Sequence, residues 1–507
     1  MSGSTAELIK ELIKELILSE NISEEHLNEI AKLPTNELIR GITNFSAFPI
    51  PRSVGSYIRE EHQIDDSLTA PYYVYIPKSY DPATKIPLVV WLHGGVSRNE
   101  FIDDINEYFD EHFIINLAEE EGWLVLAPLG RLNLTWWDKA GMENVNWQIR
   151  KLRQSYNIDG NRIIMGGFSD GGSGSYHYAF LQPDDFALFF PWSGRPDVGT
   201  QVSGSEAFIP NLRSNNQFAV NGGRDGLYPA AKLMPLMRYI IDEVDVEMSF
   251  TVYDTAKHDW SYIPEESAFM VDRVRSVRRN LYPSKIYWEC TDLDYGKNSW
   301  LNITELDTSL DRADWHKEFN YTMTDDRITI GFMADRSFEG EGVRVESLSK
   351  SENSPAIAMG LLAGDLVIGM DGNKIVKMQD LGNAKSKTKR GNKMVIRVMR
   401  DGSELDLTTM IPDATEYEAF PRNTPSGAVE VVRVGNSIFI KSSRVSQLEI
   451  YLHPNMVRLD QPMKIIVNDK KVFDLLVIPD TRLLLAEYLK NRDRRMLWTG
   501  RILVNVN

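Results

Sequence analysis

The stretch "RIIMGGFSDGGSGSYHYAF", residues 162–180, decides the fold. It starts with an apolar run, has five glycines around Ser169 within residues 166–175, and continues into a small-residue segment typical of a helix. Glycine loses more conformational entropy on folding than any other residue, so this cluster indicates a backbone bent where side chains would clash. Between a strand and a helix, residues 167–171 (GFSDG) match G-x-S-x-G, a strained turn that directs a serine hydroxyl out of a sheet.

Strands and helices alternate on both sides of this turn. Apolar runs suited to strands of a buried parallel sheet are separated by helical segments. The predicted strands are 72–77, 86–95, 123–130, 162–170, 187–194, 217–226 and 247–255, and the predicted helices are 112–122, 143–156 and 230–244. The alternation predicts an α/β domain with a doubly wound parallel sheet over residues 51–283.

The rest of the chain predicts three further parts. Residues 1–50 carry Leu-Ile pairs every four residues and predict a helical segment. Residues 284–325 and 413–507 predict an antiparallel β-sandwich, with a hairpin at residues 467–473 and a late helix at 481–493. The first of these two segments offers only about two strands, too few to be stable alone. We therefore expect the unit at 326–412 to be inserted within the sandwich.

Composition excludes several classes of partner and cofactor. A net charge of −16 argues against nucleic acid and anionic membranes as partners. The single cysteine, Cys290, excludes an internal disulfide and a multi-cysteine zinc site, and predicts an inert buried thiol. There is no H-E-x-x-H, no P-loop and no G-x-G-x-x-G opening a helix after a strand, so we expect no metal and no organic cofactor.

The sequence also bears on location. It has no run of 18 apolar residues, so we expect no membrane-spanning helix. Lysines and glutamates interrupt the apolar pairs of the first 20 residues, which is not the pattern of a signal peptide. The expected location is cytoplasmic for the sequence as it stands, and periplasmic or secreted if these residues replaced a signal peptide.

A serine hydroxyl is a poor nucleophile until a base accepts its proton, and that base needs an orienting acid. Four histidines follow Ser169 in the chain. His258, in the loop after the strand 247–255, is the one placed to serve as the base. The others are assigned elsewhere: His177 lies two turns along the helix after the serine, and His316 and His453 fall in the later domains.

The predicted acid is Asp225, which follows a strand by a short glycine loop. Other aspartates are less well placed. Asp254 and Asp259 are too close in sequence to His258 to reach its far ring nitrogen, and Asp242 and Asp245 end a helix.

A developing oxyanion needs two preorganised N–H donors. The backbone N–H of Asp170, next after the serine, is the first predicted donor. The second is expected from HGGV, residues 93–96, with Gly95 favoured and Val96 as the alternative. His93 is expected to anchor this loop by hydrogen bonding.

These motifs resemble the α/β-hydrolases, particularly the bacterial esterase branch similar to polyhydroxybutyrate depolymerases, feruloyl esterases and prolyl-oligopeptidase-like peptidases. The resemblance covers about residues 70–270, in the family's order, through YYVYIPKSYDPATKIPLVVWLHGG, YNIDGNRIIMGGFSDGGSGSYHYAF, NGGRDGLYP and HDWSYIPEE. It implies a serine hydrolase whose triad follows the order Ser169, Asp225, His258.

Loop lengths and tryptophans bear on the substrate. The segment between residues 191–194 and 217–223 is too short to contain a large lid domain. This predicts an open cleft suited to a polymeric, bulky or protein-borne ester. Trp136, Trp137 and Trp260 are candidate substrate contacts that would stack on an aromatic or sugar group, and packing over the cleft wall is the open alternative.

Residues 326–412 resemble a PDZ domain, through ITIGFMADRSFEGEGVRVESL, NSPAIAMGLLAGDLVIGMDG and NKMVIRVMRDGSELDL. Asp371-Gly372 is the expected hairpin turn. The resemblance implies capture of a peptide or protein C-terminus, with the N–H groups of Gly331 and Phe332 facing its carboxylate. The expected groove helix, KMQDLGNAKSKTK, contains Gly382 and few apolar residues, so a structural module or one that shapes the substrate cleft is the alternative.

The predicted function is that of a serine carboxylesterase. A prolyl-oligopeptidase-like peptidase uses the same triad, but no propeller precedes the hydrolase region of this sequence. The third hypothesis is a non-catalytic PDZ scaffold. The predicted strained turn argues against it, because a scaffold would not need such a turn.

Overall fold

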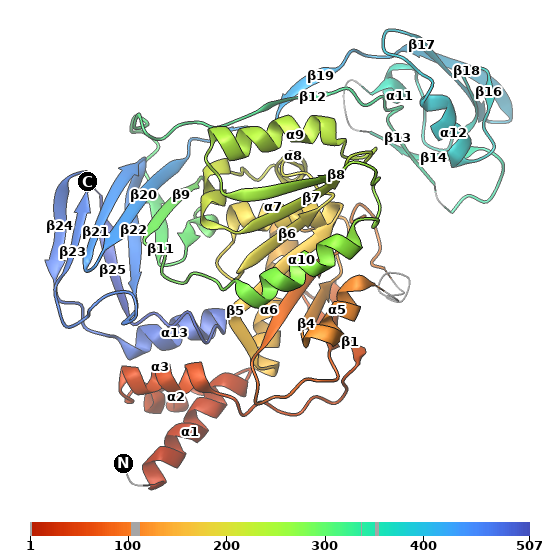
Figure 1. Ribbon diagram of the computed structural model, residues 1–507. Coiled ribbons are helices and arrows are strands. Elements are labelled where there is room, and N and C mark those ends of the chain that lie inside the picture. The colour runs from red at the N-terminus through yellow and green to blue at the C-terminus, as the bar shows by residue number, and fades with distance from the viewer. Residues whose placement is uncertain (1–2, 103–111, 336, 350–353, 507) are drawn as a thin grey trace. The chain divides into compact units, whose positions relative to one another are not determined.

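The computed structural model, shown in Figure 1, describes residues 3–102, 112–335, 337–349 and 354–506. Its contacts divide the chain into two units: residues 1–321 with 419–507, and residues 322–418. The second unit extends slightly beyond the predicted range 326–412 because β12 (Thr322–Asp325) pairs with β19 (Thr415–Glu418). The other domain boundaries remain predictions.

An eight-stranded sheet in the order β1-β2-β4-β3-β5-β6-β7-β8 is the centre of the first unit. Its strands are β1 Ser56–Gln63, β2 Thr69–Ile76, β3 Ile86–Leu92, β4 Leu124–Pro128, β5 Ile158–Phe168, β6 Leu188–Trp192, β7 Gln217–Gly222 and β8 Met248–Tyr253. Strands β3 to β8 are parallel, whereas β2 runs antiparallel to β1 and β4. The predicted α/β-hydrolase fold is confirmed, with β2 as the exception to the parallel pattern. The half-exposed, polar edge strand β1 was not predicted.

Helices cover both faces of this sheet (Figure 1). On one face, α5 (Phe113–Glu121) and α10 (Ile263–Ser276) share an apolar core with the strands. On the other lie α6 (Lys139–Ser155) and α7 (Asp170–Leu181). All seven residues of β3 are buried, as its continuous apolar sequence predicts for a strand packed on both faces. Further helical segments are α8 Val198–Ser203, η1 Ile209–Ser214, α9 Ala230–Arg238 and the π-helical turn η2 Tyr239–Glu243.

The N-terminal helices pack against the C-terminal one. α1 (Gly3–Leu18), α2 (Glu24–Ile30) and α3 (Thr35–Asn44) share an apolar cluster with α13 (Thr481–Asn491). The predicted Leu-Ile stripe supplies its buried members on α1, and α13 adds the following residues: Leu484, Leu485 and Tyr488. Burial of apolar surface therefore holds the N-terminal helices against α13.

Residues before and after unit 322–418 form two further sheets that pack as a sandwich. One sheet has the order β10-β11-β22-β25 and the other β24-β23-β21-β20-β9, and one apolar core joins them. The strands are β9 Lys285–Cys290, β10 Lys297–Asn298, β11 Leu301–Leu306, β20 Gly427–Val434, β21 Ser437–Ser443, β22 Val445–Leu452, β23 Met463–Val467, β24 Lys470–Leu475 and β25 Gly500–Asn505, with the turn η3 at Leu293–Tyr295. The pairs β9–β20 and β11–β22 join the segments before and after unit 322–418. Contrary to the expected antiparallel pattern, β21 and β23 are parallel. The predicted hairpin between β23 and β24 is present.

The second unit is a small sheet in the order β13-β14-β15-β17-β18, with β16 paired to β15. Its elements are β13 Phe332–Ala334, β14 Val343–Leu348, α11 Pro355–Ala358, β15 Leu366–Met370, β16 Asn373–Lys374, α12 Met378–Lys385, β17 Lys393–Arg400 and β18 Ser403–Met410. Asp371 and Gly372 both have left-handed φ angles, 46° and 79°, as the predicted two-residue hairpin requires.

Candidate active site

Ser169 occupies the turn between β5 and α7 in a strained conformation. Its φ of 60° and ψ of −120° are unusual for a residue with a side chain. The strain is held by close packing: a Cβ on Gly171 would lie 1.9 Å from the Leu92 carbonyl oxygen, and one on Gly167 would lie 2.5 Å from the Gly171 backbone. The glycines predicted to permit this turn are therefore required by backbone contacts.

The predicted acid and base are hydrogen-bonded to each other. His258 Nδ1 lies 2.7 Å from Asp225 Oδ2, and the Asp225 side chain is fully buried. The other carboxylate oxygen, Oδ1, accepts the backbone N–H groups of Leu227 and Tyr228, both at 2.8 Å. An ionised carboxylate only accepts hydrogen bonds, so His258 carries its proton on Nδ1 and leaves Nε2 as an acceptor.

Aromatic contacts place this pair beside the elbow. The His258 ring lies 4.8 Å from the ring of Phe168, the residue before the serine, and 5.7 Å from the Tyr228 ring. The His258–Asp225 pair therefore lies beside Phe168, the residue that precedes Ser169 at the end of β5. The histidines assigned elsewhere lie away from this pair: His177 is buried in α7, His316 contacts Glu289 and Ser443, and His453 stacks on Tyr282.

His93 anchors the loop after β3. Its Nε2 accepts the Gly130 N–H at 2.9 Å, and its carbonyl oxygen accepts the indole N–H of Trp136 at 2.9 Å. Burial lowers the pKa of His93 to about 4, so that the ring is neutral at pH 7. This arrangement is the anchoring geometry expected from the sequence.

The rest of that loop lies against the serine. A Cβ on Gly94 would come within 3.0 Å of the Ser169 Cβ, and Gly95 has a left-handed φ of 70°. The Val96 N–H donates to Asp170 Oδ2 at 3.0 Å. Because Val96 already has an acceptor, the N–H groups of Gly95 and Asp170 are the better candidates for oxyanion donors.

Two of the three tryptophan expectations need correction. Trp136 and Trp137 are only 1% and 3% exposed, so neither offers a ring face to a ligand. Trp136 packs so closely on α7 that a Cβ added to Gly174 would lie 2.3 Å from the Cβ of Trp136. Trp260, in contrast, is 36% exposed and stacks on Phe168 with ring centroids 4.1 Å apart. The loop that carries Trp136 and Trp137 follows a strand end, but this sequence position does not indicate that the two side chains are buried.

Phe168 and Tyr228 are site residues that the sequence reasoning missed. Phe168 contacts both His258 and Trp260, and Tyr228 supports Asp225 through its backbone and flanks His258 with its ring. The only sequence signal for either residue is its position next to a motif, and ring contacts across separate loops leave no further signal.

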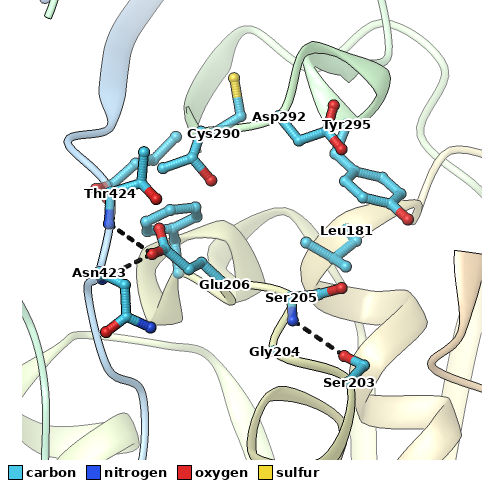
Figure 2. A pocket seen from close by; sticks show the side chains of 13 residues that line it. Leu181, Ser203, Gly204, Ser205, Glu206, Cys290, Asp292, Tyr295, Asn423 and Thr424 are labelled. Carbon is cyan, nitrogen blue, oxygen red and sulfur yellow. Dashed lines mark hydrogen bonds between the residues drawn. The ribbon is translucent and has the colours of Figure 1, made fainter.

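A pocket of about 320 Å³ lies at the opposite end of α7, where Leu181 lines it. A helix of 12 residues is about 18 Å long, so this pocket is remote from Ser169. Figure 2 shows Glu206 there, its carboxylate accepting the backbone N–H groups of Asn423 and Thr424 at 2.7 Å. Burial raises the pKa of the Cys290 thiol, also in the lining, to about 12. The thiol stays protonated and is no activated nucleophile.

Neither a metal site nor a membrane span is found within the described ranges. No three His, Cys, Asp or Glu side chains among those residues gather in a way that could bind a metal ion. No helix in the same parts of the chain combines the length and apolar character needed to cross a bilayer.

Gly331 and Phe332, which the sequence predicted to face a terminal carboxylate, lie just before and at the start of β13 in the second unit. Gly331 has a φ of 93°, and its carbonyl oxygen accepts the Ser349 N–H at 2.9 Å. Phe332 begins β13, an edge strand of the sheet. On the expected groove helix α12, Leu381 and Ala384 are buried.

Comparison with known proteins agrees with both predicted resemblances. Residues 322–411 match the PDZ domain family, so this part of the chain is a PDZ domain. A bifunctional acetylxylan esterase/xylanase from Neocallimastix patriciarum is 27% identical over 173 residues, 34% of this chain. The match spans about a quarter, 24%, of that relative's length. The predicted resemblance to an esterase, combined with a PDZ domain, is confirmed.

The solved structures that part of this chain resembles include two esterases. A thermostable esterase matches with a TM-score of 0.37 and 23% identity, covering 45% of this chain and 64% of its own. A ferulic acid esterase matches with a TM-score of 0.34 and 18% identity, covering 43% of this chain and 97% of its own.

Proposed function

We propose that this chain is a serine hydrolase that cleaves carboxylic esters through an acyl-enzyme on Ser169. The observation that carries the proposal is the His258–Asp225 pair, 2.7 Å apart, beside a serine held in a strained turn. Strain of this kind costs about 1–3 kcal/mol and persists only where the surrounding structure enforces it.

In the proposed reaction, His258 Nε2 accepts the proton of the Ser169 hydroxyl as its Oγ attacks the ester carbonyl carbon. The tetrahedral intermediate collapses when His258 returns that proton to the leaving alcohol oxygen, which leaves an acyl group on Oγ. Water then attacks the acyl carbon with His258 again as the base. The acyl–Oγ bond then breaks as His258 passes this proton to Ser169 Oγ, which releases the carboxylic acid and restores the serine. Asp225 keeps the ring in the productive tautomer.

The negative oxygen of each intermediate would accept hydrogen bonds from the backbone N–H groups of Asp170 and Gly95. Asp170 is the first residue of α7, so its N–H belongs to a helix terminus that favours negative charge. The glycine-rich loop lies against Ser169, which supports Gly95 as the second donor.

We propose a bulky or polymeric ester as the substrate, with Trp260 as a stacking surface. Its half-exposed ring is fixed by Phe168 and lies in the loop that carries His258. An aromatic face suits an aryl group or the apolar face of a sugar. The similarity to an acetylxylan esterase makes acetylated xylan the first polymer to test.

The test measures hydrolysis of p-nitrophenyl esters from acetate to decanoate and release of acetate from acetylated xylan. Ser169→Ala is expected to lower kcat by about 10⁴-fold or more, and Trp260→Ala to raise KM for the polymer more than for p-nitrophenyl acetate. Absence of ester turnover by the wild-type chain would refute the esterase. Turnover of proline-containing peptides would then identify the peptidase that the same triad permits.

We further propose that the PDZ domain binds a peptide C-terminus along β13. An edge strand accepts a further strand through backbone hydrogen bonds, and the Gly331 and Phe332 N–H groups would face the terminal carboxylate. Fluorescence polarisation on the full chain, with a library of free and C-terminally amidated peptides, tests this. Binding of free peptides that amidation abolishes supports the proposal, whereas equal binding of both forms, or none, refutes it.

A further inference from the structure

We propose that the Asp170 side chain is a positioning group that holds the oxyanion loop in place. The same residue would then act twice: its backbone N–H as an oxyanion donor, and its carboxylate as the anchor of the loop that supplies the other donor. The inference rests on the proposed esterase function for its kinetic consequence, but not for the structural contact itself.

The contact is a single hydrogen bond between two elements far apart in sequence. The Val96 N–H donates to Asp170 Oδ2 at 3.0 Å, linking the loop after β3 to the first turn of α7. Val96 is fully buried, so water does not compete for its N–H. A hydrogen bond to an ionised acceptor is roughly twice as strong as one between neutral groups.

Asp170 holds the loop from one side and His93 from the other. His93 is fixed by the Gly130 N–H on its ring and by the Trp136 indole on its carbonyl oxygen. Between these two anchors lie Gly94 and Gly95, which have little conformational preference of their own. The Val96 bond is thus the constraint directly after Gly95 along the chain, with the exposed Arg98–Gly95 contact at 2.9 Å as a weaker addition.

Precision at this point matters for catalysis. Donors stabilise an oxyanion when they are preorganised within about 2.7–3.1 Å of the position it will occupy. Gly94 is held separately, because its carbonyl oxygen lies 2.8 Å from His93 Nδ1. Releasing Val96 would therefore loosen mainly Gly95, so that its N–H would be in place for only part of the time. The expected loss falls on kcat, because the oxyanion develops in the transition state, and KM should change little.

The experiment compares Asp170→Ala, which removes the acceptor, with Asp170→Asn, which keeps an acceptor oxygen of the same reach without the charge. On p-nitrophenyl acetate, the alanine variant is expected to lose about 10-fold or more in kcat, a fraction of the effect of deleting a donor outright. Its KM should stay within about twofold and the asparagine variant within about threefold of wild-type kcat. Unchanged kcat in the alanine variant, or an equal loss in both, would overturn the proposal.

Amide hydrogen exchange tests the same contact without any substrate. Exchange of the Val96 N–H is expected to be faster in Asp170→Ala than in Asp170→Asn or wild type. Equal exchange in all three would overturn the proposal. If the wild-type chain hydrolyses no ester, the proposed function fails while this measurement still decides the loop contact. Asp170→Ser, whose side chain is too short to reach Val96, replaces the alanine variant if that variant does not fold.

Discussion

Asp225→Asn tests the site most sharply, because the structure dictates how the new amide must sit. In the wild-type chain, Oδ1 accepts two backbone N–H groups, from Leu227 and Tyr228, both at 2.8 Å. An amide NH₂ cannot accept these bonds, so the oxygen of the asparagine must take the Oδ1 position. Its NH₂ group then faces His258 Nδ1.

This orientation changes the tautomer of the His258 ring. A donor facing Nδ1 forces that nitrogen to act as an acceptor, which moves the ring proton to Nε2. Nε2 can then no longer accept the proton of Ser169. Folding should change little, since both backbone hydrogen bonds to position 225 are retained.

The expected loss in kcat is about 10⁴-fold, or about 5.4 kcal/mol of transition-state stabilisation, as for a histidine held in the wrong tautomer. The assay is kcat and KM on p-nitrophenyl acetate, with thermal unfolding to check the fold. Asp259→Asn is the matched control, because this nearby carboxylate accepts the Ser261 N–H at 3.1 Å, whereas the partner of His258 Nδ1 is Asp225. A folded Asp225→Asn variant that retained a tenth of wild-type kcat would refute the reasoning.

Three further substitutions test the packing and the buried charges. Gly171→Ala puts a Cβ 1.9 Å from the Leu92 carbonyl oxygen, so we expect a loss of about 3 kcal/mol or more in urea unfolding. Trp136→Ala should cost about 3–5 kcal/mol in the same assay while leaving KM for small esters unchanged in any folded fraction, because this ring is core and not a ligand contact. Burial alone would raise the pKa of Glu289, but its hydrogen bond from His316 and its ion pair with Arg422 outweigh this and lower the pKa to about 2. Its stabilising contribution, about 3 kcal/mol, is therefore present above pH 4.5 and lost as the pH falls towards 2. Urea unfolding should accordingly show a loss of stability over this range that is smaller in Glu289→Gln than in wild type.

Local sequence determined the elements of the hydrolase region and identified Ser169 as its proposed nucleophile. The continuous apolar runs at β3 and β5 mark strands buried on both faces, and the glycines around Ser169 mark the turn because only backbone without side chains fits there. These are properties of short segments, because the residue types alone determine the hydrophobic periodicity of a segment and the space that its side chains occupy. The order Ser169, Asp225, His258 then limited the partners, and the structure places the latter two 2.7 Å apart.

Tertiary structure alone decided what each loop does. Nothing in TWWDK distinguishes a tryptophan that packs behind α7 from one that lines a cleft, and Trp136 is buried while Trp260 is half-exposed. The sequence favoured Gly95 over Val96, but only the structure supplies a physical reason, a hydrogen bond from the Val96 N–H to a side chain 74 residues away. Burial and hydrogen bonding between distant segments depend on which loops come into contact in the folded chain. A local sequence pattern of period two or 3.6 does not determine those contacts.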